Sequence, residues 1–399
     1  MSAPTLRYGT PDEASMLPDR VDRVKKLAEG WVADGHTPSL VVLAARKGVI
    51  FLHEAYGVLT PEEDSPPLQL DSMFPISSIT KTITATAIMI LVEDGLLGLN
   101  RPLVDYIPEI CGKGTEEVLV HHLLSHTSGY HEVEVIKHIT KKNEILSEVP
   151  PCEETQHPLV HEYLFFSYSA PLWKSPGVEC AYSNHNYALL GEIVRRVSGQ
   201  SLADFAAERI FNPLNMADTN YIVSDSFDPR VIKRADDAPF AQRIHRYIDG
   251  VDSRQMRETP NGFTGIWSTA MDIAIFGQMF LNCGSYGEVR ILSRPTVSEM
   301  TRNQIPGIGT VNQIGNFVEG SLGFGWLVHS NGKWKYYDGS LHSQESVSHP
   351  GRGGAYFWVD PLYELVGIYF SVWLEMGTLG LAKSNFDLFQ NAITASVND

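Results

Sequence analysis

The stretch from Phe74 to Asp94 limits what this chain can fold into more than any other part of it. Between Thr82 and Val92 there is no charged residue, no glycine and no proline, and the only polar residues are threonines. A helix that is apolar on nearly every side is a buried helix, and a run of about eleven residues is too short to span a bilayer. Gly95 follows as a typical helix end. We therefore predict a central core helix that ends near Gly95.

Ser78 and Lys81 stand at the start of this helix. Residues three apart on a helix share one face, with Cβ atoms about 5–6 Å apart. Burial and the positive helix end both lower the pKa of a lysine, which frees its amine to accept a proton from the serine. Ser-x-x-Lys also arises easily by chance, and a second copy runs from Ser330 to Lys333 in a polar turn. The pattern predicts a nucleophile only if the rest of the chain supplies partners.

Composition excludes several classes of partner. The 399 residues allow a large core, and 43% hydrophobic with 20% charged residues is typical of a globular protein. A net charge of −16 argues against nucleic acid or an anionic membrane surface as partner. The polar segment from Met1 to Asp19 resembles no signal peptide, and the four cysteines show no paired spacing. We expect free thiols and a cytoplasmic protein, and leave open whether it forms a homo-oligomer.

Patterning places strands at both ends of the chain. In the N-terminal part, the hydrophobic pattern predicts a helix over Arg20–Trp31 and a hairpin that turns at Arg46–Gly48. The predicted strands are Leu40–Ala45, Val49–Tyr56, Gly323–His329, Ser343–Ser348, Ala355–Val359 and Leu365–Val372. A last helix is expected over Leu379–Val397.

The middle of the chain is expected to be mostly helical. Helices are predicted over Tyr187–Val197, Leu202–Ile210 and Met271–Asn282, the last with Ser268 as its N-cap. Residues 131–175 are polar and interrupted by prolines, so we expect an irregular insertion over a site.

A group of histidines invites a metal-site interpretation. They are His121, His122, His126, His131 and His138. The chain has no His-Glu-x-x-His and no Cys-x-x-Cys pattern. We therefore predict no metal site and no cofactor, and expect these side chains to satisfy hydrogen bonds around a loop.

Two further motifs follow Ser78-x-x-Lys81 in order. Tyr182-Ser183-Asn184 is the only Tyr-x-Asn among sixteen tyrosines, and His349-Pro350-Gly351 is the only His-x-Gly. Together the three motifs resemble those of the serine β-lactamase and penicillin-binding-protein superfamily, in its class C-like branch with the family VIII carboxylesterases. The runs 122–129 and 265–272 also resemble signature runs of that branch, and the likeness covers roughly residues 20–397.

The resemblance implies an α+β fold: an α/β sandwich lobe with an antiparallel sheet flanked by helices, joined to an all-α lobe. We expect a single β-lactamase-like domain over residues 1–399. Its α/β lobe is expected over about residues 1–75 and 290–399, and its mainly helical lobe over about 76–289. The active site is expected between them.

The resemblance also implies a role for each motif. Ser78 is the acyl-accepting nucleophile, and Lys81 and Tyr182 share the proton transfers. A tyrosine has an ordinary pKa of about 10, so it needs a neighbouring ammonium to act as a base. Asn184 orients Lys81 and contacts the substrate. The backbone N–H groups of Ser78 and Arg352 are expected to form the oxyanion hole.

The third motif departs from the β-lactamase pattern. Those enzymes usually carry Lys-Thr-Gly or Lys-Ser-Gly there, whereas this chain has His349 and Gly351, with Arg352 as the nearby cation. With an ordinary pKa of about 6.5, His349 would be mostly neutral at pH 7 and gain charge toward about pH 6. A neutral group attracts a β-lactam carboxylate weakly, so hydrolysis of small-molecule esters, or amides, is expected instead.

Three other functions stay open. The first is β-lactamase or D-amino-acid peptidase activity, and the second is acyl transfer to an alcohol or amine on the same scaffold. The third is a non-catalytic binding or sensor domain that keeps the pocket. Covalent labelling by a serine-directed reagent separates the third from the others, and product analysis with an added acceptor separates hydrolysis from transfer.

Overall fold

A seven-stranded sheet is the centre of the structure. A computed structural model describes residues 2–145, 148–243, 246–311, 316, 318–329, 338–374 and 385–398. The sheet has the order β1-β3-β2-β13-β12-β11-β10 and is antiparallel except for the β1–β3 pair. Its strands are β1 (Arg7–Tyr8), β2 (Ser39–Arg46), β3 (Val49–Gly57), β10 (Leu327–Val328), β11 (Val347–Gly351), β12 (Ala355–Asp360) and β13 (Leu365–Ser371). The pairing of β2 with β13 joins the N-terminal hairpin to the C-terminal strands, which confirms the predicted sheet.

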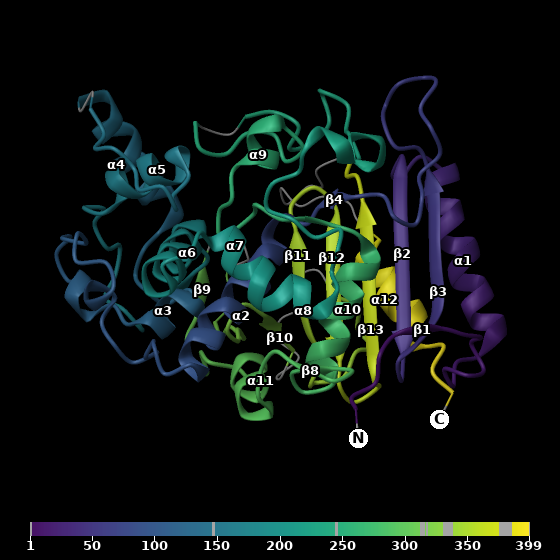
Figure 1. Cartoon of the computed structure of the whole chain (residues 1–399). Helices are drawn as coiled ribbons and strands as arrows, with labels where there is room; N and C mark the ends of the chain where they lie inside the picture. The colour runs from purple at the N-terminus through teal and green to yellow at the C-terminus, as the bar shows by residue number, and fades with distance from the viewer. Residues whose placement is uncertain are drawn as a thin grey trace.

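Helices cover both faces of this sheet (Figure 1). Helices α1 (Pro18–Ala33) and α12 (Phe386–Thr394) pack on one face, and α10 (Ala270–Leu281) packs on the other. Alternate residues of a strand point to opposite faces. In β2, Leu40 and Val42 therefore face the α1/α12 core, whereas Val41 and Leu43 face the α10 core. Burial on both faces explains why β2 is apolar without alternation.

Helix α2 (Thr80–Glu93) is the predicted core helix. Every residue from Thr80 to Leu91 is buried. Gly95 is left-handed, with φ of 74°, and donates to the carbonyl of Val92 while Leu96 donates to that of Leu91. This pair of hydrogen bonds is a Schellman motif, which ends the helix where the sequence predicted.

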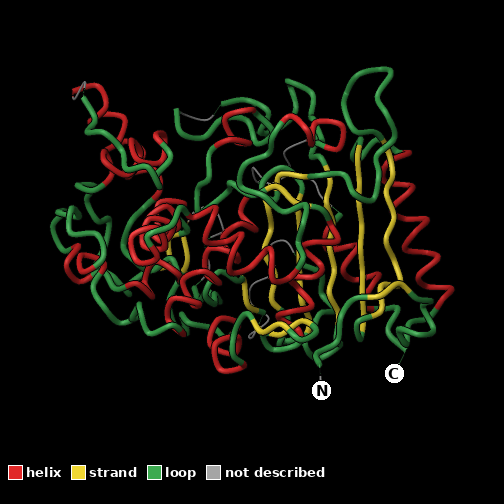
Figure 2. The backbone as a smooth tube through the Cα atoms, viewed as in Figure 1, coloured by secondary structure: helices red, strands yellow, loops and turns green. Residues whose placement is uncertain are grey.

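A mostly helical region lies beside the sheet, where Figure 2 shows chiefly helices and loops. Its α-helices are α3 (Val120–Leu124), α4 (Glu132–Ile145), α5 (Pro158–Ser167), α6 (Asn184–Ser198), α7 (Leu202–Ala206), α8 (Asn212–Leu214) and α9 (Arg254–Glu258). Short turns of helix are η1 (Ser77–Ile79), η2 (Leu103–Asp105), η3 (Thr115–Glu117), the π-type η4 (Ala207–Phe211) and η5 (Asp225–Arg230), and α11 (Arg294–Thr301) lies nearer the sheet. Short strands pair as β4 (Phe74–Pro75) with β6 (Trp267–Ser268), β5 (Cys180–Ala181) with β9 (Thr310–Val311), and β7 (Ser285–Tyr286) with β8 (Val289–Arg290).

Two predictions for the middle of the chain were wrong. Residues 131–175 are not irregular, because they contain α4 and α5. In α4 only Glu132, Val135 and Ile139 are buried, so its apolar stripe is narrow. The N-cap of α10 is Thr269, whose hydroxyl accepts from the Asp272 N–H at 3.2 Å, rather than Ser268.

The C-terminal strands also differ from the prediction. The strand expected over 323–329 pairs only at β10, because Gly323 and its neighbours turn against α11. Residues 343–346 form a turn tied to Asp360, so β11 begins later and includes His349. The last helix is α12, and residues 379–384 of its predicted range lie outside the described residues. No helix in the described ranges is long and apolar enough to cross a membrane.

Candidate active site

Ser78 lies in the short turn η1, directly between strand β4 and helix α2. The residue before it, Ser77, has φ of 46°, in the left-handed region that side chains rarely adopt. The Ser77 hydroxyl donates to the carbonyl oxygen of Arg352 at 2.8 Å. This strained turn presents Ser78, which is half-buried, at the N-terminal end of α2.

Lys81 is fully buried one turn after Ser78. Its Nζ lies 3.1 Å from Ser78 Oγ, 2.9 Å from Asn184 Oδ1 and 3.0 Å from the carbonyl oxygen of Phe263. Burial lowers the Lys81 pKa well below its usual value, and the positive charge of Arg352 lowers it further, while Glu132 opposes both effects. Burial therefore shifts Lys81 toward its neutral, proton-accepting form.

A neutral amine has two N–H groups and one lone pair. The carbonyl of Phe263 can only accept a hydrogen bond, and so can the amide oxygen of Asn184. The two N–H groups of Lys81 are used on these two acceptors. The lone pair then points at the third neighbour, Ser78 Oγ, where it can accept the hydroxyl proton.

Tyr182 and Asn184 come from the start of α6. Tyr182 precedes the helix and is 7% exposed, and Lys81 Nζ lies 4.8 Å from the centre of its ring. Asn184 is the first residue of α6, so this helix begins three residues before Tyr187, where the sequence predicted its start. The His126 ring stacks on Tyr182 with centroids 4.4 Å apart. The second motif therefore meets the first through the Lys81 side chain.

His349 lies within β11, beside Tyr182, with ring centroids 6.4 Å apart. Its Nδ1–H donates to the carbonyl oxygen of Pro350 at 2.8 Å, because a carbonyl can only accept. Burial, and then the charge of Lys81, lower the His349 pKa to about 3. The expectation that His349 gains charge near pH 6 is therefore wrong, because the ring is buried.

The third motif also closes on the Ser78 turn. A Cβ on Gly351 would stand 2.3 Å from the carbonyl oxygen of Ile76, so only glycine allows this approach. The Ser77–Arg352 hydrogen bond lies next to this contact. The guanidinium of Arg352 stacks over Phe240 at 4.8 Å. This arrangement brings together the backbones whose N–H groups were predicted to form the oxyanion hole.

Three residues of this site were missed from the sequence. Glu132, the first residue of α4, accepts hydrogen bonds from Ser183 Oγ at 2.8 Å and from Asn184 Nδ2 at 3.3 Å. Phe263 contributes only a backbone carbonyl, so its side chain carries no signal. Ser77 stands beside the motif serine, but its role depends on a partner 275 residues away.

Of the histidines named from the sequence, His126 joins this site through its stacking on Tyr182. The described residues bring together no three histidine, cysteine, aspartate or glutamate side chains that could hold a metal ion. All four cysteines have free thiols, as predicted. The second Ser-x-x-Lys, residues 330–333, lies outside the described residues.

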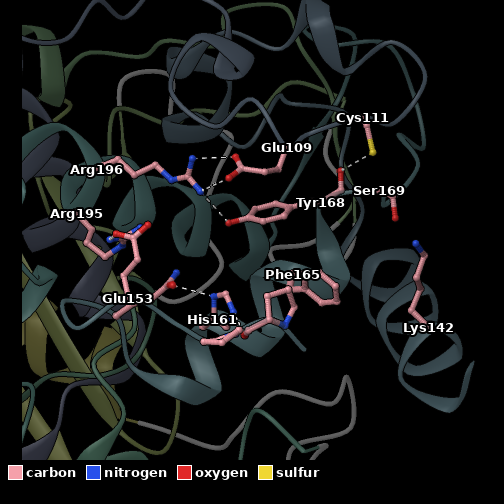
Figure 3. A pocket seen from close by; sticks show the side chains of 13 residues that line it. Glu109, Cys111, Lys142, Glu153, His161, Phe165, Tyr168, Ser169, Arg195 and Arg196 are labelled. Carbon is pink, nitrogen blue, oxygen red and sulfur yellow. Dashed lines mark hydrogen bonds and ion pairs between the residues drawn. The ribbon is translucent and has the colours of Figure 1, made fainter. Parts of the chain in front are cut away.

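A separate cavity of about 420 Å³ lies in the helical region (Figure 3). Its two arginines are saturated by acids. Arg196 forms two hydrogen bonds to Glu109, and Arg195 contacts Glu192 and Glu153. This pairing leaves neither guanidinium available for a ligand anion, and none of the three motifs lines the cavity.

Comparison with known proteins shows a family likeness over most of the chain. A family model described as Beta-lactamase matches residues 24–379. A protein of Mycobacterium tuberculosis is 29% identical over 256 residues, which are 60% of this chain and 61% of that protein. This chain thus spans about three fifths of the length of that relative.

Two solved structures share the fold. A penicillin-binding protein homologue from Caulobacter crescentus has a TM-score of 0.75 and 20% identity, with 96% of this chain and 98% of that chain covered. A family VIII carboxylesterase has a TM-score of 0.71 and 19% identity, with 96% and 98% covered. At these identities the likeness establishes the architecture alone.

Proposed function

The chain belongs to the beta-lactamase family, and from this premise we propose that it is a serine hydrolase that cleaves carboxylic esters through an acyl-enzyme on Ser78. One observation carries the proposal. Lys81 Nζ is buried and bonded to two acceptors, Asn184 Oδ1 and the Phe263 carbonyl, and its third bonding direction faces Ser78 Oγ. A charged ammonium would donate to all three neighbours, whereas a neutral amine donates to two of them and keeps its lone pair for the Ser78 hydroxyl at 3.1 Å.

Acylation begins when the Lys81 amine takes the proton of the Ser78 hydroxyl. Ser78 Oγ then forms a bond to the ester carbonyl carbon, and the backbone N–H groups of Ser78 and Arg352 stabilise the oxyanion. The carbon–oxygen bond to the alcohol breaks, Tyr182 gives its phenolic proton to that alcohol, and Lys81 passes the proton it took from Ser78 to Tyr182. Water attacks the acyl-enzyme in the same way and releases the acid.

Preference for uncharged esters follows from the third motif. His349 is neutral, and its one N–H is already used on the Pro350 carbonyl. It therefore offers an anionic substrate neither a charge nor a donor. A β-lactam carboxylate loses a charge-assisted bond of roughly 1.5–3 kcal/mol at this position.

The test compares two chromogenic substrates on the same enzyme. We expect kcat/KM for a short-chain p-nitrophenyl ester to exceed that for a chromogenic cephalosporin by at least about tenfold, which corresponds to roughly 1.4 kcal/mol. Ser78→Ala is the control, and it should abolish both reactions. Equal or better cephalosporin hydrolysis would contradict the ester assignment.

A further inference from the structure

A buried carboxylate stands behind the proposed proton acceptor. Glu132 is 9% exposed and is the first residue of α4, so it comes from a different helix than any of the three motifs. Its oxygens accept from Ser183 Oγ at 2.8 Å, from Asn184 Nδ2 at 3.3 Å and from the His185 N–H at 3.3 Å. All three partners are donors, which an ionised carboxylate satisfies fully.

These contacts fix which way the Asn184 amide faces. A carboxylate can only accept, so the NH2 group of Asn184 must face Glu132, and its oxygen must face Lys81. If the amide were reversed, its NH2 group would face the Lys81 nitrogen and compete for the lone pair. The direction of that lone pair toward Ser78 therefore depends on Glu132, through Asn184.

We propose that Glu132 is a positioning residue for catalysis, which holds the Asn184 amide so that the Lys81 lone pair faces Ser78, and which balances the charge that Lys81 gains. This inference rests on the proposed function of Ser78 and Lys81. Glu132 does not touch the reacting atoms. It acts through Asn184 and through its own negative charge.

The charge acts in a definite direction. The titratable and charged side chains that face Lys81 are Glu132 from α4, Arg352 after β11, His126, His349, Tyr182 and Tyr187. Glu132 is the acid that raises the Lys81 pKa, against burial and Arg352, which lower it. Loss of its charge should make Lys81 a weaker base. Because the active form of Lys81 is unprotonated, the acid limb of kcat/KM should then move to lower pH.

A purely structural role makes a different forecast. Helix α6 has no side-chain cap of its own, and Glu132 accepts from the His185 N–H in its first turn. A carboxylate there also stabilises the helix dipole. If capping were its whole role, its removal would lower the melting temperature and the amount of active enzyme without moving the acid limb.

The first variant is Glu132→Gln, which has the same shape. Gln offers one acceptor oxygen and an NH2 group, so it cannot accept from all three donors. We expect kcat for a p-nitrophenyl ester to fall about 10- to 100-fold, which is less than the roughly 10²- to 10⁴-fold contributed by a proton-transfer group itself, because Lys81 stays in place. The acid limb of kcat/KM should move down by roughly half a pH unit or more. Ser183→Ala, which removes another partner of the same carboxylate, is the matched control and should leave the limb in place.

The second variant, Glu132→Gln with Asn184→Asp, reverses donor and acceptor while it keeps the net charge. The Gln NH2 group can then donate to the new carboxylate, which faces Lys81. We expect the acid limb to return to its wild-type position or above, and kcat to rise at least about threefold over Glu132→Gln alone. This comparison also serves if the single variant folds poorly.

The outcomes separate the two proposals. An acid limb that stays in place in Glu132→Gln, or a limb that moves equally in Ser183→Ala, would overturn the role of Glu132 while the function of Ser78 stood. If a serine-directed phosphonate leaves wild-type Ser78 unlabelled, the proposed function fails, and the role of Glu132 falls with it.

Discussion

The Ser77 hydroxyl donates a 2.8 Å hydrogen bond to the backbone carbonyl of Arg352, a residue 275 positions later in the chain. This bond joins the turn that carries Ser78 to the turn that follows β11. The two halves of the proposed oxyanion hole therefore share one fixed link. The bond is made by a residue whose φ of 46° lies in the left-handed region, a conformation that the surrounding structure must hold in place.

Removal of this link should lower catalysis more than stability. We expect Ser77→Ala to reduce kcat for a p-nitrophenyl ester about 3- to 30-fold, since a hydrogen bond is worth roughly 0.5–1.5 kcal/mol and the oxyanion donors lose alignment. KM should change little. Ser72→Ala removes another buried hydroxyl, which accepts from the Gln69 N–H, and is the control that should keep full activity. Equal losses in the two variants would contradict a role for the Ser77–Arg352 bond.

Lys81 and Tyr182 are predicted to act as one proton-transfer unit, since Lys81 Nζ lies 4.8 Å from the Tyr182 ring. Lys81→Ala and Tyr182→Phe should each lower kcat by about 10²- to 10⁴-fold. The double variant should be little worse than the poorer single one, because groups that work as a unit are strongly non-additive. Steady-state kinetics on all four enzymes measures this. Losses that multiply would assign the two side chains to separate steps.

The preference for esters over cephalosporins should depend on the side chain at position 349. It should not change between pH 8 and pH 6. Because burial lowers the His349 pKa to about 3, the ratio of cephalosporin to ester kcat/KM should stay flat from pH 8 to pH 6. His349→Lys should raise this ratio about 10- to 100-fold through a charge-assisted bond of roughly 1.5–3 kcal/mol. His349→Gln, which stays neutral, should not. A wild-type ratio that rises severalfold toward pH 6 would contradict this account.

Acid stability should depend on buried histidines outside the site, of which His185 is one. Burial lowers the His185 pKa to about 3, whereas an unfolded histidine titrates near 6.5. Between these values the unfolded chain binds the extra proton, so the free energy of unfolding falls as pH falls, by up to about 1.4 kcal/mol per pH unit for one group.

Chemical denaturation at several pH values measures this slope. Between pH 6 and pH 5 the slope should be smaller in His185→Phe by roughly 1 kcal/mol per pH unit. The exposed His36, replaced in the same way, should leave the slope unchanged. A slope that is identical in wild type and His185→Phe would show that His185 does not titrate on unfolding.

The sequence predicted those helices and strands whose signals lie within a few neighbouring residues. The charge-free run of α2 and its end at Gly95 were read directly from the sequence, as was the β2–β3 hairpin. The narrow stripe of Val135 and Ile139 hid α4, because its other positions are mostly polar or exposed. The run 323–329 is apolar and buried, but its backbone turns against α11 at Gly323, where a Cβ would stand 2.1 Å from the Met300 carbonyl oxygen. Little of the run therefore pairs as a strand.

The site was predictable only where a motif carries it. Ser78, Lys81, Tyr182 and Asn184 were found as patterns, whereas Glu132 and the Phe263 carbonyl depend on contacts between distant segments. Nothing within a few residues of either marks it as a neighbour of Lys81. The protonation of His349 was misjudged for a similar reason, since its pKa depends on a burial that sequence does not reveal.

The central claim is that Lys81 activates Ser78 alone among the serines of this chain. Treatment with a fluorophosphonate, followed by intact mass and peptide mapping, tests it most directly. We expect one adduct per chain, on the peptide that contains Ser78, with no adduct in Ser78→Ala and labelling slowed at least about 100-fold in Lys81→Ala. An adduct on another serine such as Ser125, or undiminished labelling of Ser78→Ala, would contradict the account.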